Sequence, residues 1–137
     1  MSDLHDVALH LDRLMRRVGA RLHAAGEEID PDGVGPIGGM ILTTLAEIEP
    51  APVRDIVDLM QRDKSQMTRA LKMLESRGLI KRQPSSDDRR VQLVSLTSKG
   101  RKKVDVIRHV MSDIVEELLA PLSTTERRKF ATLLRKL

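Results

Sequence analysis

The stretch Asp63-Lys-Ser-Gln-Met-Thr-Arg-Ala-Leu-Lys-Met-Leu-Glu-Ser-Arg-Gly-Leu-Ile80 decides the fold, because it divides into an apolar and a polar side. At about 100° of rotation per residue, one arc of a helix holds Met67, Ala70, Leu71 and Leu74. The opposite arc holds Ser65, Gln66, Thr68, Arg69, Lys72 and Ser76. Asp63 is placed to cap the first turn, with Gln66 at the matching position of a capping box, and Gly78 is placed to end the helix. We therefore predict one helix with a core face and an exposed polar face.

Apolar stripes on both sides predict two short helices before this helix and a hairpin after it. Before it, residues 41–48 form a helical stripe that Pro50 ends, and Pro52 is placed to begin a second short helix up to Met60. After it, residues 79–83 and 91–96 are typical of short strands, joined by the charged turn 84–90. The order is that of a winged helix-turn-helix unit.

The two ends of the chain are predicted to be long helices. Apolar residues recur at helical spacing from Leu4 to Leu22 and again from Val104 to Leu119, after an N-cap at Thr97. A last helix begins with the capping box Ser123-x-x-Glu126. These apolar stripes exceed what one small winged helix could cover, so they need a partner surface.

Residues 61–103 form a strongly basic block. They hold 13 Lys and Arg but only 4 Asp and Glu, whereas the whole chain has a net charge of +4. Such a local excess is typical of a surface that binds a polyanion. The polar arc of the central helix suits base edges and phosphates in a major groove, and Asp87 to Arg90 could place a guanidinium in the minor groove. The other cations, Lys81, Arg82 and Lys99 to Lys103, are expected near phosphates or in solvent.

The chain resembles the MarR family of bacterial transcription regulators. The resemblance is carried by Leu45 to Met60, by Asp63 to Ile80, by Asp87-Asp-Arg-Arg90 and by Val94-Ser-Leu-Thr-Ser-Lys-Gly100. It implies a mainly α fold with a small β-hairpin (α+β), a winged helix-turn-helix with long N- and C-terminal dimerisation helices. Within one compact domain overall, it places an N-terminal dimerisation helix and loop at 1–35, the DNA-binding lobe at 36–98 and the C-terminal dimerisation helices at 99–137.

The resemblance also implies a function and the residues that perform it. We expect a sequence-specific regulator that binds double-stranded DNA as a homodimer on a pseudo-palindromic operator, most often as a ligand-responsive repressor. Four positions of the recognition helix match the family, and the wing carries its Asp-x-Arg motif. Two more residues, Lys72 and Arg89, are added from charge and position. The expected DNA-binding residues are Ser65, Gln66, Thr68, Arg69, Lys72, Asp88, Arg89 and Arg90.

One departure from the family pattern concerns the start of the second helix. The region 30–39 is rich in glycine and proline, so we expect a loop with helix resuming near residues 37–40. The family usually has a bulky residue where this chain has Gly39, and commonly holds a small phenolic or anionic effector nearby. Either the helix starts later than expected, or the freed space is used. The expected effector residues are Arg13, Arg16, Arg17, Gly38, Gly39 and Met40.

Composition and motifs exclude several other functions. Without cysteine the chain has no thiolate nucleophile or thiol-based sensor, and one Phe with no Tyr or Trp provides no platform for unpaired bases. The pattern G-x-G-x-x-G at residues 33–38 lacks the preceding strand that a dinucleotide site needs. We therefore expect a protein that is not an enzyme and that holds neither a cofactor nor a metal ion. A metal ion bound between helices is the alternative that stays open.

No apolar run approaches the roughly 20 residues that span a bilayer, so we expect a cytoplasmic protein. Two rival functions stay open. One is a winged-helix protein-interaction module without specific DNA binding, and the other is an enzyme that holds a nucleotide or a metal.

Overall fold

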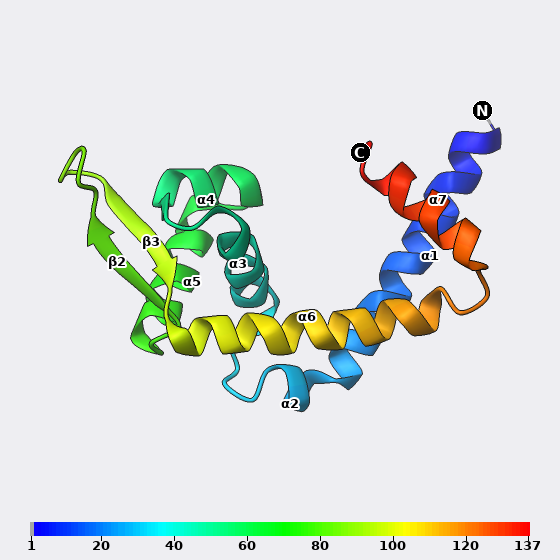
Figure 1. Cartoon of the computed structure of the whole chain (residues 1–137), viewed down its shortest axis with the longest axis horizontal. Helices are drawn as coiled ribbons and strands as arrows, with labels where there is room; N and C mark the ends of the chain where they lie inside the picture. The colour runs from blue at the N-terminus through cyan, green and yellow to red at the C-terminus, as the bar shows by residue number, and fades with distance from the viewer. Residues whose placement is uncertain (1) are drawn as a thin grey trace. The chain divides into compact units, whose positions relative to one another are not determined.

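The computed structural model describes residues 2–137, which form helices and a small antiparallel sheet (Figure 1). The elements are α1 (Ser2–Ala24), α2 (Gly26–Ile29), α3 (Gly35–Ile48), β1 (Ala51–Pro52), α4 (Val53–Met60), α5 (Lys64–Ser76), β2 (Ile80–Pro84), β3 (Gln92–Leu96), α6 (Ser98–Leu118) and α7 (Thr124–Leu134). They form two units, one of Glu27–Arg108 and one of the described residues before Glu27 with His109–Leu137. The fold class predicted from the sequence is confirmed, whereas the functional division at residues 35 and 98 stays a prediction.

Helix α5 forms where its wheel predicts it. The Asp63 carboxylate accepts a hydrogen bond from the Gln66 amide at 3.3 Å, which satisfies one of the free donors of the first turn. Among the described contacts, only this half of the expected capping box is formed. At the other end Gly78 adopts a φ of 72°, which lets the chain reverse into β2.

The sheet has the strand order β1-β3-β2 and is antiparallel throughout. The hairpin of β2 and β3 pairs Ile80 with Leu96 and Pro84 with Gln92. The strand β1 was not predicted, because two residues are too few to show alternation. It pairs Ala51 with Val94 and so joins the middle of β3 to the segment between α3 and α4.

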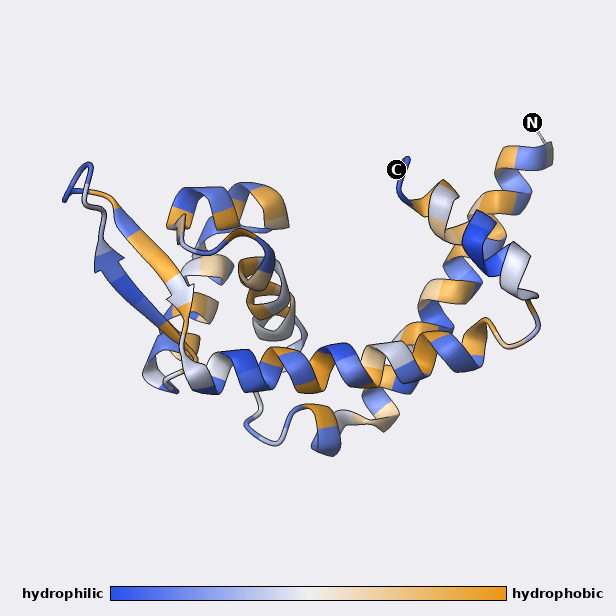
Figure 2. Ribbon diagram, viewed as in Figure 1, coloured by the Kyte–Doolittle hydropathy of each residue, from blue (hydrophilic) through white to orange (hydrophobic). Residues whose placement is uncertain are grey.

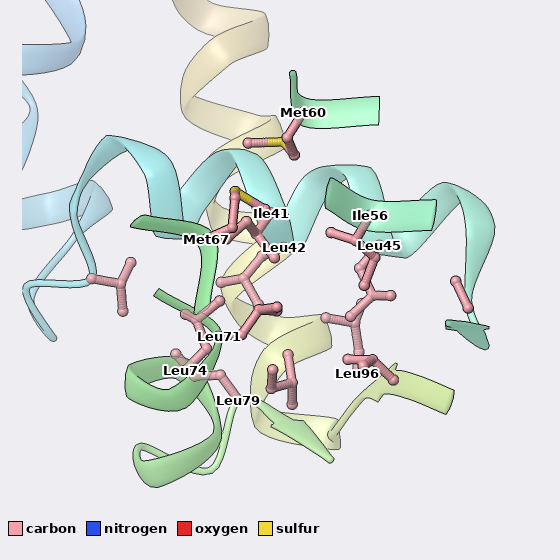
Figure 3. Packing of buried hydrophobic residues seen from close by; sticks show 14 of the residues in the cluster. Ile41, Leu42, Leu45, Ile56, Met60, Met67, Leu71, Leu74, Leu79 and Leu96 are labelled. Atoms are coloured by element: carbon pink, nitrogen blue, oxygen red, sulfur yellow. The ribbon is translucent and has the colours of Figure 1, made fainter. Parts of the chain in front are cut away.

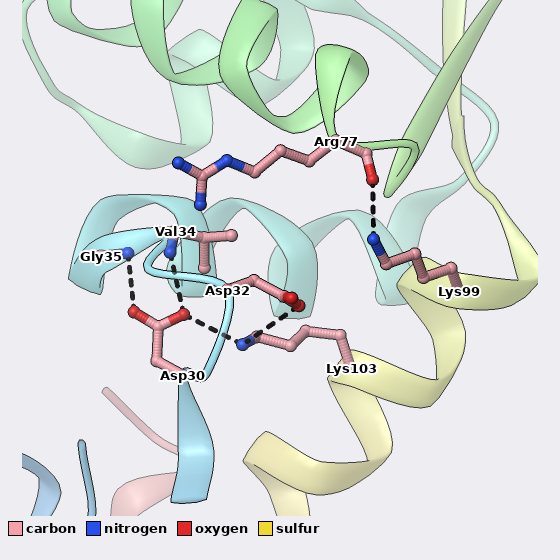
Figure 4. Close-up of polar contacts among 7 residues, drawn as sticks. All are labelled: Asp30, Asp32, Val34, Gly35, Arg77, Lys99 and Lys103. Carbon is pink, nitrogen blue, oxygen red and sulfur yellow. Dashed lines mark hydrogen bonds and ion pairs between the residues drawn. The ribbon is translucent and has the colours of Figure 1, made fainter. Parts of the chain in front are cut away.

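The start of α3 corrects the prediction of a loop through residue 39. The helix begins at Gly35, because the Asp30 carboxylate accepts hydrogen bonds from the amides of Val34 at 2.8 Å and Gly35 at 3.0 Å (Figure 4). Pro36 is tolerated in this first turn, where its missing amide hydrogen has no partner to lose. The helix therefore starts earlier than expected. A later helix start, which was one of the two explanations offered for Gly39, is thus wrong.

The same carboxylate holds a buried cation. Lys103 is 6% exposed, and its Nζ lies 2.9 Å from Asp30 Oδ1 and 4.0 Å from Asp32 Oδ2 (Figure 4). The expectation that Lys103 lies near phosphates or in solvent is therefore wrong. Partial burial raises the pKa of Asp30, but hydrogen bonds from Lys103, Gly35 and Val34 outweigh it and hold the pKa below its ordinary value. An ion pair thus fastens the loop before α3 to α6.

The main cluster of buried hydrophobic residues lies within the unit Glu27–Arg108 (Figure 3), and Val110 and Ile114 of the other unit are also buried. Its centre is formed by side chains of α3 and α5 that are at most 1% exposed, namely Ile41, Leu42, Leu45, Met67, Leu71 and Leu74. Ile56 of α4 and Leu79 and Leu96 at the base of the hairpin close it. The apolar arc predicted for α5 is therefore the face that packs on this core.

The other unit exposes many large apolar side chains. Nine of the twelve exposed large hydrophobic residues belong to it, and the structure buries no residue of α7. On α1 these residues are Leu4, Val7, Leu9, Leu11 and Met15. Orange apolar positions alternate with blue polar ones along this helix (Figure 2). In a single copy of the chain, this apolar surface is therefore exposed to water.

A tight corner joins α5, the hairpin and α6. Thr97 caps α6 by accepting from the Gly100 amide at 3.0 Å, and its hydroxyl donates to the Gly78 carbonyl at 2.6 Å. The Thr97 amide donates to the Leu79 carbonyl at 3.1 Å. A Cβ on Gly100 would lie 2.0 Å from that same carbonyl oxygen. The corner therefore requires glycine at position 100.

We predict that Gly100→Ala destabilises the protein by about 1–3 kcal/mol, because the added methyl group must displace backbone. Gly26→Ala is the matched control, since a Cβ there would meet nothing within 4 Å. Thermal unfolding at one fixed protein concentration measures both. A Gly100→Ala protein that melts with the wild type would refute the tight corner.

Asp30→Asn should lower the melting temperature at neutral pH, because it removes the charge that pairs with Lys103. Since the folded pKa of Asp30 is depressed, its contribution is complete above the unfolded pKa and is lost as the pH falls through the folded one. The difference between wild type and variant should therefore shrink below about pH 4. Asp32→Asn, at 4.0 Å from the amine, should have the smaller effect at neutral pH. A difference that is constant across this pH range would contradict the assignment.

Candidate nucleic-acid interface

The polar face of α5 points away from the core. Ser65, Thr68, Arg69 and Lys72 are exposed and Gln66 is half-buried, while Met67 and Leu71 on the opposite face are buried. The packing of the apolar face thus fixes which side chains the helix presents. An exposed row of hydroxyls, an amide and cations is suited to base edges and phosphate oxygens.

Polar contacts order the first turn of this face. The Ser65 hydroxyl donates to Asp63 Oδ2 at 2.6 Å, and the Thr68 hydroxyl donates to the Lys64 carbonyl at 2.9 Å. The hydrogen bond from Ser65, followed by that from the Gln66 amide, lowers the pKa of Asp63. Asp63 is therefore a carboxylate at neutral pH, and it holds Ser65 in a defined position.

The wing tip contains an oriented guanidinium. Arg90 Nε and Nη2 donate to the two oxygens of Asp88 at 3.1 and 3.2 Å, and the Arg90 amide donates to Oδ1 at 3.1 Å. The side-chain bond and then the amide bond lower the pKa of Asp88. The side chain of Arg90 nevertheless stays 90% exposed. Asp88 therefore orients the guanidinium that the sequence places at the wing tip, and its role on DNA stays a prediction.

Two other expected DNA-binding residues have a simpler environment. Lys72 and Arg89 are exposed, and among the residues that the structure describes neither forms a hydrogen bond or an ion pair through its side chain. Both lie on elements that carry the other candidates, one on α5 and one at the wing tip. Their side chains are available to phosphates.

Sequence reasoning missed the contacts that position these elements. Arg82 Nε on β2 donates to Glu75 Oε2 on α5 at 2.8 Å, which ties the hairpin to α5. Glu49 after α3 accepts from the Leu96 amide at 3.2 Å and pairs with Arg101 at 2.9 Å. Opposite charges are visible in the sequence, but nothing in their spacing tells which pair across elements.

The residues expected to line an effector pocket lie in both units. Gly38 and Gly39 are inside α3, where a Cβ on Gly38 would lie 3.1 Å from Val34 Cβ and 3.4 Å from Met73 Cε. The space at Gly38 is therefore used by neighbouring side chains. Met40 is 44% exposed. On α1 the arginines at positions 13, 16 and 17 are exposed, and Arg16 pairs with Asp12 at 3.0 Å.

Surface depressions, metal-binding groups and membrane-spanning helices would indicate other kinds of site in residues 2–137. A surface depression of about 220 Å³ on the Glu27–Arg108 unit is lined by Lys99, Lys102 and Lys103 together with residues of α2 and the following loop. It contains none of the three α3 residues expected at an effector pocket. Within the described part of the chain, no group of three or more His, Cys, Asp or Glu side chains could hold a metal, and no helix is long and apolar enough to cross a membrane.

Known proteins resemble this chain in sequence and in fold. The MarR family model matches residues 39–91. YwoH of Bacillus subtilis, an uncharacterized HTH-type transcriptional regulator, is 32% identical over 118 residues, which are 85% of this chain and 85% of YwoH. YdgJ of the same bacterium, with the same kind of name, is 33% identical over 88 residues, or 64% of this chain. The chain spans about half of that relative, at 54% of its length.

Solved structures give the same fold. A mutant of MarR from Escherichia coli, complexed with operator DNA, superposes with a TM-score of 0.69 at 24% identity. The match covers 97% of this chain and 96% of that chain. Its helices and wing therefore correspond to those described above over almost the whole length.

Proposed function

The chain belongs to the MarR family of transcription regulators, which have a DNA-binding helix-turn-helix fold, and we propose that it binds a double-stranded operator sequence-specifically as a homodimeric repressor. One combined observation carries this proposal. The same unit presents a row of exposed polar residues on α5, namely Ser65, Thr68, Arg69 and Lys72, and an Arg90 that Asp88 orients at the wing tip. One element presents groups that read bases, and the other presents a cation for the DNA backbone or minor groove.

In this proposal the two elements have different tasks. Helix α5 enters the major groove, where the five donors of Arg69 suit the O6 and N7 acceptors of guanine. The wing places Arg90 at the minor groove, where the narrow groove concentrates negative potential. Lys72 and Arg89 neutralise phosphates. The operator complex of the Escherichia coli relative supports a DNA-binding role for this fold.

The exposed apolar unit supports the homodimer. Val7, Leu11 and Met15 recur every four residues on α1 and are 59%, 53% and 62% exposed. A second copy of the same surface would remove them from water, which is the usual isologous solution. Two recognition helices related by twofold symmetry would then read half-sites about 34 Å apart, one helical turn of a pseudo-palindrome.

Control by a small phenolic or anionic effector is the finer part of the proposal. The exposed guanidinium groups of Arg13, Arg16 and Arg17 support it, because they suit a carboxylate or phenolate. Binding would release the operator by changing the separation of the two recognition helices. If phenolic acids alter neither the melting temperature nor the operator affinity, the proposed response to an effector is wrong.

A protein-interaction module is the rival that uses the same helix. The centre of a protein interface is depleted in charged residues. The exposed face of α5 instead combines Arg69 and Lys72 with small hydroxyls. The surface is thus better suited to DNA.

Replacement of the two arginines tests the division of tasks. Arg69→Ala should weaken binding to promoter DNA next to the protein's own gene by about 1–3 kcal/mol and reduce base preference. Arg90→Ala should weaken specific and random duplexes alike and reduce the salt slope by about 1. Gel-shift titrations at two salt concentrations measure both effects, with Lys129→Ala on α7 as a control for lost charge. Equal losses on specific and random duplex for Arg69→Ala would refute base reading by this residue.

Sedimentation velocity tests the homodimer. The wild type should sediment as a dimer at micromolar concentration, and Leu11→Asp should shift it to monomer because a charge would enter the proposed interface. Leu59→Asp is the matched control, because Leu59 is 59% exposed on the other unit. A monomeric wild type, or a Leu11→Asp protein that remains dimeric, would contradict this interface.

A further inference from the structure

The hydroxyl groups on the outward face of α5 have a property that their residue types do not reveal. A serine or threonine hydroxyl has one proton to donate and two lone pairs that accept. Its direction of hydrogen bonding toward a ligand therefore depends on whether a protein group already takes the proton. On this face the structure shows where the protons of Ser65 and Thr68 go.

Ser65 gives its proton to a charged acceptor. Its Oγ lies 2.6 Å from Asp63 Oδ2, the length of a charge-assisted hydrogen bond. The carboxylate is itself fixed, because the same oxygen accepts from the Gln66 amide at 3.3 Å. To accept the proton of Ser65, a DNA group would have to displace the Asp63 carboxylate. Toward a base in the major groove, Ser65 therefore offers its free lone pairs, which accept hydrogen bonds.

Thr68 is arranged in the same way one turn later. Its Oγ1 donates to the Lys64 carbonyl at 2.9 Å, the common bond from a helical hydroxyl to the residue four before it. Thr68 is exposed, so the remaining lone pairs face outward with the rest of the polar arc. Both hydroxyls thus present acceptors.

We propose that Ser65 and Thr68 act on DNA as hydrogen-bond acceptors only, and that they select adenine or cytosine on the strand they face. Adenine N6 and cytosine N4 carry the only donor groups that bases present in the major groove, whereas guanine and thymine present acceptors there. This inference rests on the proposed function, since it assumes that α5 enters that groove. Arg69, which has only donors, complements them by selecting guanine.

The experiment combines protein variants with base analogues. Selection from a random duplex pool with the wild-type protein first defines the preferred site. Each adenine of that site is then replaced by purine, and each cytosine by 2-pyrimidinone, which removes the amino group. In a parallel series 7-deazapurines remove the N7 acceptor. Wild type, Ser65→Ala and Thr68→Val are titrated against every duplex, so that effects of an analogue on the DNA itself cancel between proteins.

We expect one amino-group removal to weaken wild-type binding about three- to tenfold and to have no further effect on Ser65→Ala. A second position should behave in the same way with Thr68→Val. The 7-deaza series should weaken all three proteins equally. Ser76→Ala is the matched control, because its hydroxyl also donates to a helix carbonyl, that of Met73 at 2.8 Å, but lies in the last turn of α5.

Three results would overturn the inference. They are coupling of either hydroxyl to a 7-deaza position, the absence of coupling to any base, and an equal effect of Ser76→Ala. Circular dichroism and melting temperature confirm that each variant is folded. Failure of the proposed function gives a different result, because a wild-type protein that enriches no sequence from the pool refutes specific DNA binding itself.

Discussion

The packing of α5 on α3 is the constraint on which the rest of the site depends. Met67, Leu71 and Leu74 are at most 1% exposed and lie against Ile41, Leu42 and Leu45 (Figure 3). Because a helix turns by about 100° per residue, fixing these side chains also fixes the direction of every residue between them. Ser65, Thr68 and Arg69 point outward for that reason. The chemistry of the outward face is thus a consequence of the buried one.

The wing is placed by a second set of contacts that converge on the end of α5. Gly78 turns the chain, the Leu79 carbonyl packs on Gly100 at the start of α6, and Arg82 pairs with Glu75. Farther out, the tip is ordered by the hairpin, by the Asp88–Arg90 pair and by turn hydrogen bonds such as that from the Ser85 amide to the Val91 carbonyl at 2.8 Å. These contacts hold the base of the wing against α5. In the proposed complex with DNA, the tip is the part of the wing that reaches the groove.

Patterns that repeat along one element could be predicted from the sequence, and contacts between elements could not. The wheel of α5 correctly identified its buried and exposed faces, since both follow from the spacing of Met67, Leu71 and Leu74. The start of α3 was predicted too late, because its cap is Asp30, a side chain outside the helix. Lys103 was expected near phosphates or in solvent, because only the fold shows that Asp30 lies beside it. The pair of Glu75 with Arg82 was missed for the same reason.

Backbone amide chemical shifts, recorded on adding a duplex that carries the preferred site, show whether α5 and the wing contact DNA. We expect the largest changes on Ser65 to Lys72 of α5 and on residues 85–90 of the wing, with small changes at Asp55 and Asp58 on α4. Changes confined to α4 or to α7, with α5 and the wing unaffected, would contradict this expectation.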